Sequence, residues 1–297
     1  MVGIKPLKIK ELIHRTTDYF AKHNIPSPRL DAEVLLSYLL KKERIFLYLN
    51  WDNIIEDHTM DIFRKLVAKR AKHVPIAYLI GYKEFMSIDF EVSKKTLIPR
   101  PETEILIETT LKKVAAQSGK ELVAIDMGTG CGNIAVALAK NRNIKIYASD
   151  ISEDALSISR KNAKKNKVGK SIRFLCGNLF EPFTRLNLNG KIDFIISNPP
   201  YISSADFNEL PIDIKQYEPR IALDGGINGI DFYPELVKGA EEFLKPHGFL
   251  IMEMGYGQVE EIKKLVSLSK AFLEPEIVMD YGGIERVIIC TRSVIPK

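Results

Sequence analysis

The chain has 297 residues, of which 45% are hydrophobic, so it can bury at least one full core, and its length predicts about two domains. Its formal net charge of +5 is too small for a protein that binds nucleic-acid backbone along its whole length, and the excess lies in residues 1–85, which contain 15 Lys/Arg against 10 Asp/Glu. The three cysteines are widely spaced without a His cluster, which predicts neither a metal site nor a disulfide framework. No apolar run approaches the roughly 18 residues that span a bilayer, and the N-terminal residues lack an apolar signal segment, so we expect a cytosolic protein that does not bind membranes.

The first part of the chain predicts a small helical bundle. Apolar residues recur at helical spacing through residues 7–78, and Ser27 followed by Pro28 is typical of a helix start. The basic side chains of residues 59–73 fit either a solvated face or a contact surface for a partner. We place this helical domain at residues 1–85.

The hydrophobic period changes to two after the helical part. It predicts a half-exposed strand over residues 86–92, as part of a hairpin. The stretch IPRPETE, residues 98–104, has the prolines of an extended connector that leads into a helix. We therefore place a hairpin and linker at residues 86–104 and a second domain at residues 105–297.

Strands and helices alternate through most of this second domain. The predicted strands cover residues 122–125, 144–148, 172–175, 194–196 and 249–252. Such alternation predicts an α/β fold, a parallel sheet with helices on both faces. Two final strands, at residues 277–279 and 286–291, are separated only by the turn DYGGIE, which makes the last strand antiparallel.

A glycine-rich loop follows the first predicted strand of this sheet. It contains Asp126, Gly128, Thr129, Gly130, Cys131 and Gly132. Glycines let a backbone approach a ligand closely, and the helix N-terminus behind them offers free N–H groups. The spacing G-x-G-x-G differs from the dinucleotide fingerprint, and by itself it fits a nucleotide-like cofactor loop or a tight turn equally well.

Two further strand ends carry polar residues. Asp150 ends the next strand, where an acid can accept hydrogen bonds from ribose hydroxyls, although alone it could simply cap the helix that begins at Ser152. Together with the glycine loop, it favours an adenosine-containing cofactor. After the third strand, Asn178 and Leu179 are placed to border an adenine, with a plain turn beside the core as an equal alternative.

The stretch DFIISNPPYI, residues 193–202, runs a strand into two consecutive prolines. Pro199 and Pro200 lack N–H donors and restrict the residue before each of them, so the strand must end at Asn198. Plain punctuation is one interpretation, because turns often use Asn and Pro. The other is that the rigid prolines hold the Asn198 side chain and the following carbonyls as fixed acceptors at the carboxyl end of a strand, where open α/β sheets bind ligands.

With the D-x-G-x-G-x-G loop, the acid after the second strand, the N-P-P-Y sequence ending at Tyr201 and the antiparallel last strand, the chain resembles the class I S-adenosylmethionine-dependent methyltransferases. The segments RLDAEVLLSYLL, PIAYLIG, IPRPETE, YEPRIALDGGINGIDFY and DYGGIERVI look like the release factor glutamine methyltransferase family, over nearly the whole chain. One residue departs from the family pattern: Asn178 stands where the family usually has Asp.

The resemblance implies a fold, a cofactor and a substrate. The fold is a seven-stranded Rossmann-like sheet with an antiparallel last strand, preceded by a small helical bundle and a hairpin linker. The cofactor is S-adenosyl-L-methionine, converted to S-adenosyl-L-homocysteine, held by the glycine loop, Asp150, Asn178, Leu179 and Asn198. The substrate is the Gln of the Gly-Gly-Gln motif in a peptide-chain release factor, methylated on its side-chain amide nitrogen and presented by the helical domain.

The resemblance also assigns roles around the substrate amide. The Asn198 side-chain oxygen and the Pro199 carbonyl accept its two N–H bonds, Tyr201 packs on its plane, and Pro200 helps to keep the acceptors in place. No general base is evident, and Glu102 and Glu104 fit either the substrate entrance or exposed positions in the connector.

Two other functions remain open from the sequence. N-P-P-Y is shared with enzymes that methylate exocyclic amino groups of DNA or RNA bases, but residues 105–297 have balanced charge and no insertion long enough for base recognition, so we expect no direct nucleic-acid partner. A module that only retains the cofactor is the third interpretation, and the intact N-P-P-Y argues against it.

Overall fold

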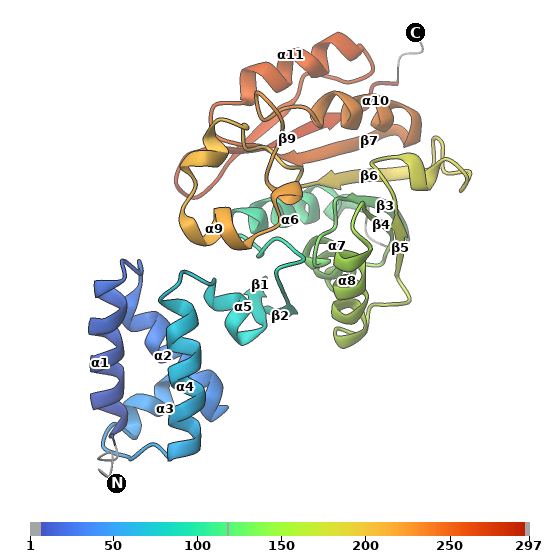
Figure 1. Cartoon of the computed structure of the whole chain (residues 1–297). Coiled ribbons are helices and arrows are strands. Elements are labelled where there is room, and N and C mark those ends of the chain that lie inside the picture. Colours follow the sequence, from blue (N-terminus) through green and yellow to red (C-terminus); the bar gives the residue numbers. More distant parts are fainter. Residues whose placement is uncertain (1–6, 118, 295–297) are drawn as a thin grey trace. The chain divides into compact units, whose positions relative to one another are not determined.

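The computed structural model describes residues 7–117 and 119–294, and the chain divides into two compact units (Figure 1). The first unit comprises Met1–Tyr82 and Pro211–Tyr217, and the second comprises Lys83–Leu210 and Glu218–Lys297. The short segment of the first unit lies within the span that the sequence places in the second domain. No helix within the described segments is both long and apolar enough to cross a membrane.

The first unit is a bundle of helices around one apolar core. Its helices are α1 (Ile9–Lys22), α2 (Pro28–Leu40), α3 (Arg44–Leu49), α4 (Asp57–Arg70), α5 (Ile76–Ile80) and α9 (Ile212–Tyr217). Pro28 stands at the first turn of α2, as its place after Ser27 predicts. Phe20 and Phe63 are buried in the core, and a buried ion pair joins Arg70 Nε to Asp31 Oδ2 at 2.6 Å.

A two-stranded hairpin follows, formed by β1 (Tyr82–Phe85) and β2 (Ile88–Glu91). The predicted strand over residues 86–92 is wrong at its start, because Met86 and Ser87 form the turn with positive φ values of 51° and 57°. Two-residue hairpin turns need such values, but Gly, Asn and Asp are the residues that signal them, and none stands here. Glu104 supports this turn, since its Oε1 accepts a hydrogen bond from the Met86 N–H at 2.7 Å.

The second unit contains a 7-stranded sheet in the order β5-β4-β3-β6-β7-β9-β8. Its strands are β3 (Leu122–Met127), β4 (Ile144–Asp150), β5 (Ile172–Cys176), β6 (Ile192–Ser197), β7 (Leu244–Glu253), β8 (Glu276–Met279) and β9 (Glu285–Thr291). Strands β3 to β7 pair in parallel, whereas β9 runs antiparallel to both β7 and β8. The predicted α/β fold with an antiparallel last strand is confirmed.

Helices cover both faces of this sheet. They are α6 (Glu102–Lys113), α7 (Asn133–Asn141), α8 (Glu153–Lys165), α10 (Tyr233–Phe243) and α11 (Val259–Ser269), with short 3-10 turns η1 (Ala115–Gln117), η2 (Glu181–Phe183), η3 (Asp206–Glu209) and η4 (Arg220–Ala222). Figure 1 shows α10 and α11 on one side of the sheet and α6, α7 and α8 on the other. This layering buries both faces of the central strands, which explains their nearly continuous apolar sequences.

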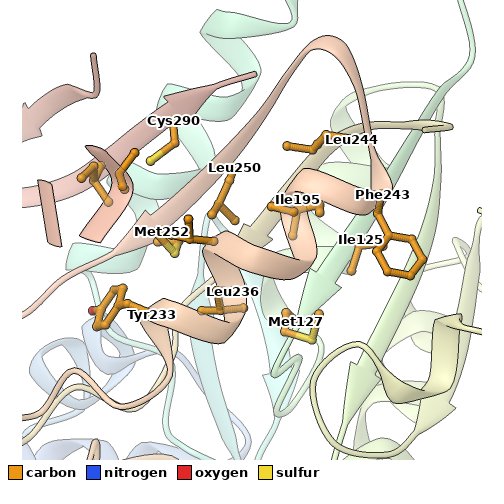
Figure 2. Close-up of a cluster of buried hydrophobic side chains, with 14 of the residues drawn as sticks. Ile125, Met127, Ile195, Tyr233, Leu236, Phe243, Leu244, Leu250, Met252 and Cys290 are labelled. Atoms are coloured by element: carbon orange, nitrogen blue, oxygen red, sulfur yellow. The ribbon is translucent and has the colours of Figure 1, made fainter. Parts of the chain in front are cut away.

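The face under α10 is a continuous apolar cluster (Figure 2). Leu236 and Phe243 of α10 pack against Ile195 of β6 and against Leu250 and Met252 of β7, and all five are buried. Successive strand residues point to opposite faces, so Leu250 and Met252 share this side of the sheet. This cluster packs α10 onto β6 and β7 and so holds the strands whose carboxyl ends form the site.

Gly239 of α10 packs closely against the aromatic ring of Phe180. The Phe180 ring stacks on Phe243 with centroids 5.3 Å apart, and a Cβ at residue 239 would lie 2.2 Å from that ring. We therefore expect Gly239→Ala to destabilise the protein by about 1–3 kcal/mol through overpacking, although Ala is the better helix former. Chemical unfolding measures the change. In a Phe180→Ala background the same substitution should cost nothing, and an undiminished cost there would contradict the packing argument.

Candidate active site

A cavity of about 370 Å³ lies at the carboxyl ends of β3, β4, β5 and β6. The predicted site residues among those that line it are Gly128, Gly130, Asp150, Asn178, Leu179, Asn198, Pro199 and Pro200. Asp126, Thr129, Cys131, Gly132 and Tyr201 lie outside the lining, next to it along the chain. The structure thus brings four separate strand ends, those of β3, β4, β5 and β6, together around one cavity.

The glycine loop wraps one wall of this cavity in a conformation that requires glycine. Gly128, Gly130 and Gly132 all have positive φ values, of 73°, 55° and 82°. A Cβ at Gly128 or Gly130 would meet no atom within 4 Å, which leaves that side of the loop open. At Gly132 a Cβ would lie 3.1 Å from Ser159 Cβ, so this glycine also permits the close approach of α8.

Asp126 supports the loop from behind. Its side chain is fully buried, Oδ2 accepts a hydrogen bond from Thr129 Oγ1 at 2.6 Å, and Oδ1 has no partner among the described residues. Burial raises the pKa of Asp126 to about 7. Asp126 and Thr129 shape the loop, and direct contact of either residue with a cofactor stays a prediction.

Asp150 joins the loop to the second strand end. Its Oδ2 accepts from the Gly130 N–H at 2.8 Å and its Oδ1 from the Ser152 N–H at 2.9 Å. The side-chain cap of α8 comes from Ser152, whose Oγ accepts from the Ala155 N–H, so Asp150 is not the cap residue. Burial raises the pKa of the Asp150 carboxyl, against the effect of these backbone hydrogen bonds. Each oxygen keeps a second lone pair for a hydroxyl of a ligand.

The segment after β5 forms another wall. Asn178 is exposed and Leu179 is half-buried with a φ of 42°. Gly177 allows the chain to turn there, because a Cβ at this position would lie 2.6 Å from Pro182 Cγ. Both predicted residues therefore reach the cavity from a tightly constrained turn.

The N-P-P-Y turn is held by three hydrogen bonds that the sequence analysis did not predict. The Ile202 N–H donates to the Leu223 carbonyl at 3.0 Å, and the Gly225 N–H donates to the Ile202 carbonyl at 2.8 Å. From the other side, Gln258 Nε2 donates to the Tyr201 carbonyl at 2.9 Å. The ALDGG segment was visible as a family feature, whereas Gln258 carries no local sequence signal.

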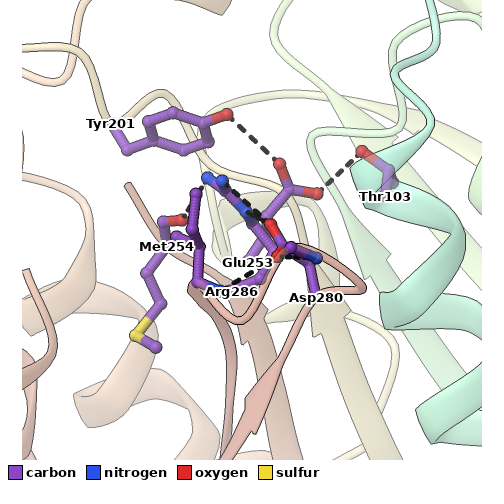
Figure 3. Close-up of polar contacts among 8 residues, drawn as sticks. Thr103, Tyr201, Glu253, Met254, Asp280 and Arg286 are labelled. Atoms are coloured by element: carbon purple, nitrogen blue, oxygen red, sulfur yellow. Dashed lines mark hydrogen bonds and ion pairs between the residues drawn. The ribbon is translucent and has the colours of Figure 1, made fainter. Parts of the chain in front are cut away.

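A buried polar chain connects Asn198 to the end of β7. Asn198 Nδ2 lies 3.0 Å from Thr103 Oγ1, which lies 2.7 Å from Glu253 Oε2. The Tyr201 hydroxyl lies 3.2 Å from Glu253 Oε1 (Figure 3). Burial raises the pKa of Glu253 to about 7, against hydrogen bonds from Thr103 and Tyr201 and the charge of Arg286.

Sheet order, glycine loop, acid after β4 and the N-P-P-Y turn at the end of β6 together define a class I methyltransferase. Residues 101–210 match the family described as "Methyltransferase small domain", and residues 11–81 match the "PrmC N-terminal domain". The chain belongs to the release factor glutamine methyltransferase family, and it is an enzyme of the methyltransferase class.

Full-length relatives carry this assignment. The chain is 37% identical to the release factor glutamine methyltransferase of Geobacter sulfurreducens, over 94% of this chain and 95% of the relative. It is 36% identical to that of Aquifex aeolicus, over 97% of each chain. Two solved structures share the fold: the hMettl16 catalytic domain (TM-score 0.57, 13% identity, 88% of this chain and 93% of that chain) and a methyltransferase from Pyrococcus furiosus (TM-score 0.51, 18% identity, 78% and 98%).

Gly225 packs closely against the backbone of the N-P-P-Y turn. A Cβ there would lie 2.7 Å from the Pro200 carbonyl oxygen and 2.8 Å from that of Gly229, both backbone atoms. We expect Gly225→Ala to displace the turn and lower kcat about 100-fold, since a shift of roughly 1 Å at reacting groups costs that much. Methyl-transfer kinetics measure it. Gly169→Ala, where a Cβ meets nothing within 4 Å, is the control. Equal activities of the two variants would contradict the idea that packing at Gly225 holds the N-P-P-Y turn in place.

Proposed function

We propose that this enzyme transfers a methyl group from S-adenosylmethionine to the side-chain amide nitrogen, N5, of the Gln in the Gly-Gly-Gln motif of a peptide-chain release factor. The observation that carries the proposal is the placement of Asn198 and Pro199 in the lining of the same cavity as Gly130 and Asp150. Two hydrogen-bond acceptors beside a cofactor wall suit a primary amide, which has two N–H donors on one nitrogen.

The cavity fits an adenosine-containing sulfonium cofactor. Its glycine wall is open to a close ligand, and the Asp150 carboxyl at its rim has lone pairs for both ribose hydroxyls. Leu179 and Ile221 supply apolar surface, and Asn178 a polar edge, for a base. When bound, S-adenosylmethionine supplies an electrophilic methyl group; orientation and electrostatics are left to the protein.

The chain's own residues must overcome the weak nucleophilicity of an amide nitrogen. Its lone pair is delocalised into the carbonyl, the resonance that keeps peptide bonds planar. Asn198 Oδ1 and the Pro199 carbonyl accept the two N–H bonds, which aims the nitrogen and stabilises the positive charge that develops on it. Tyr201, next to the cavity lining along the chain, is proposed to pack on the amide plane. Once the methyl group has moved from sulfur to nitrogen, the surplus N–H proton passes to solvent, so the step needs no general base.

The helical unit is proposed to hold the release factor. Residues 1–85 carry the whole net charge of +5, which attracts acidic regions of a folded partner. The same unit exposes large apolar side chains on and after α3, among them Ile45, Leu49 and Ile54. Exposed apolar residues beside basic ones are typical of a protein-docking surface. A substrate of the translation machinery places the enzyme in the cytoplasm.

Asp150 provides the test of the cofactor. We expect Asp150→Ala to weaken S-adenosylmethionine binding about 10- to 100-fold, because hydrogen bonds to a charged group contribute about 1.5–3 kcal/mol. Titration calorimetry measures the affinity, and Gly169→Ala, outside the cavity lining and with nothing within 4 Å of an added Cβ, should bind the cofactor as wild type does. Tight binding of NAD with no binding of S-adenosylmethionine would overturn the assignment.

The substrate is tested with labelled methyl donor. Wild-type enzyme should label full-length release factor and leave its Gln→Ala variant, duplex DNA and single-stranded DNA and RNA unlabelled. Asn198→Ala should lower the rate about 10² to 10³-fold, as loss of one transition-state contact does. Label in nucleic acid, or in the Gln→Ala factor, would reject the substrate and leave the methyltransferase class intact.

A further inference from the structure

The hydroxyl of Thr103 has one proton and two polar neighbours. Its Oγ1 lies 2.7 Å from Glu253 Oε2 and 3.0 Å from the Asn198 amide. When Glu253 is ionised its carboxylate can only accept, so in that state the Thr103 proton points to Glu253. The Thr103 oxygen is then only an acceptor toward Asn198, and the end of the amide that faces it must be the NH2 group.

We propose that Thr103 and Glu253 are positioning residues that fix which way the Asn198 amide faces. With NH2 held by Thr103, the Asn198 oxygen is the end left for the substrate amide. The described residues make no hydrogen bond to this oxygen, and Asn198 lines the cavity. This inference rests on the proposed function, in which Asn198 Oδ1 accepts a substrate N–H.

Burial makes the arrangement strict. Thr103 is 2% exposed and Glu253 0%, so no bulk water competes for their hydrogen bonds. The Tyr201 hydroxyl donates to the other oxygen of Glu253, so both carboxylate oxygens are held by the segments around the site (Figure 3). Thr103 comes from α6, Glu253 from β7 and Asn198 from the end of β6, so one hydroxyl ties three elements to the substrate acceptor.

Protonation of Glu253 would release this constraint. A neutral carboxyl can donate to Thr103, which frees the Thr103 proton for Asn198 and allows the amide to turn over. Arg286 favours the ionised form of Glu253, and Glu102 opposes it. Two tyrosines also contact this residue: the Tyr201 hydroxyl bonds to its carboxyl, and the Tyr233 hydroxyl donates to its backbone carbonyl. Arg286 is itself held by Asp280 and the Met254 carbonyl. Burial raises the pKa of Glu253 to about 7, so this carboxyl changes its protonation near neutral pH.

Three substitutions, each made in the full-length protein, test whether Thr103 and Glu253 position Asn198. Wild-type kcat should rise as pH increases through about 7, when Glu253 ionises. Thr103→Val should lower kcat at pH 8 about 10- to 100-fold and abolish this pH dependence, because the link to Asn198 is lost. Glu253→Gln should also lose the pH dependence, since its amide can donate to Thr103 at every pH. Thr103→Ser keeps the hydroxyl and should keep both rate and pH profile.

The matched control is Thr110→Val. Thr110 is a buried threonine of the same helix. Among the described residues its hydroxyl bonds only to the Leu106 carbonyl, so its removal should leave kcat and the pH profile unchanged. Calorimetry should show that Thr103→Val binds S-adenosylmethionine as wild type does. If Thr103→Val melts at a much lower temperature than Thr110→Val, the pH profile of Glu253→Gln decides the question.

The outcomes separate this inference from the proposed function. A Thr103→Val enzyme with wild-type kcat, or one that retains the wild-type pH dependence, would overturn the positioning role while methylation of the release factor stands. The same holds if Glu253→Gln keeps the pH dependence. Failure of the wild-type enzyme to methylate the factor would reject the proposed function, and this inference with it.

Discussion

The site depends on the register in which β3 pairs with its two neighbours. Met127, the last residue of β3, lies opposite Ser149 of β4 on one side and Ser197 of β6 on the other. The residues that come next along the three segments therefore lie at the same level of the sheet. They are Gly128, the first glycine of the loop, Asp150 and Asn198. Because strand side chains alternate between faces, a slip of one residue in either pairing would turn Asp150 or Asn198 away from the cavity.

This constraint explains why sequence reasoning located the cavity walls. Apolar runs that alternate with helices predict a parallel sheet, and the carboxyl ends of parallel strands lie at one edge. The sequence alone therefore predicts that Gly128, Asp150 and Asn198 lie close together. The structure places them around one cavity. Their roles toward cofactor and substrate rest on the proposal and not on their position alone.

The support of the site could not be predicted in the same way. Thr103 is 95 residues from Asn198 and 150 from Glu253 along the chain, and their side chains meet only after the sheet has formed. Glu253 follows the apolar run FLIM of β7 and looks like an ordinary polar strand end. The sequence drew attention to the acids of the connector, Glu102 and Glu104, instead. Glu104 holds the hairpin turn, whereas the acid linked to Asn198, through Thr103, is Glu253.

The pocket chemistry leaves substrate choice to another part of the protein. A glutamine side chain and the exocyclic amine of a base both present a planar NH2 group, and the two acceptors proposed at Asn198 and Pro199 would fit either one. A buried polar network is costly unless every member has a hydrogen-bond partner, so such a network favours a rigid pocket. A rigid pocket of this kind selects for a flat amino group but does not distinguish one molecule that carries such a group from another. Selectivity for one protein must then come from surface outside the cavity. We propose that the helical unit, which matches its own family and carries the net positive charge, provides that surface.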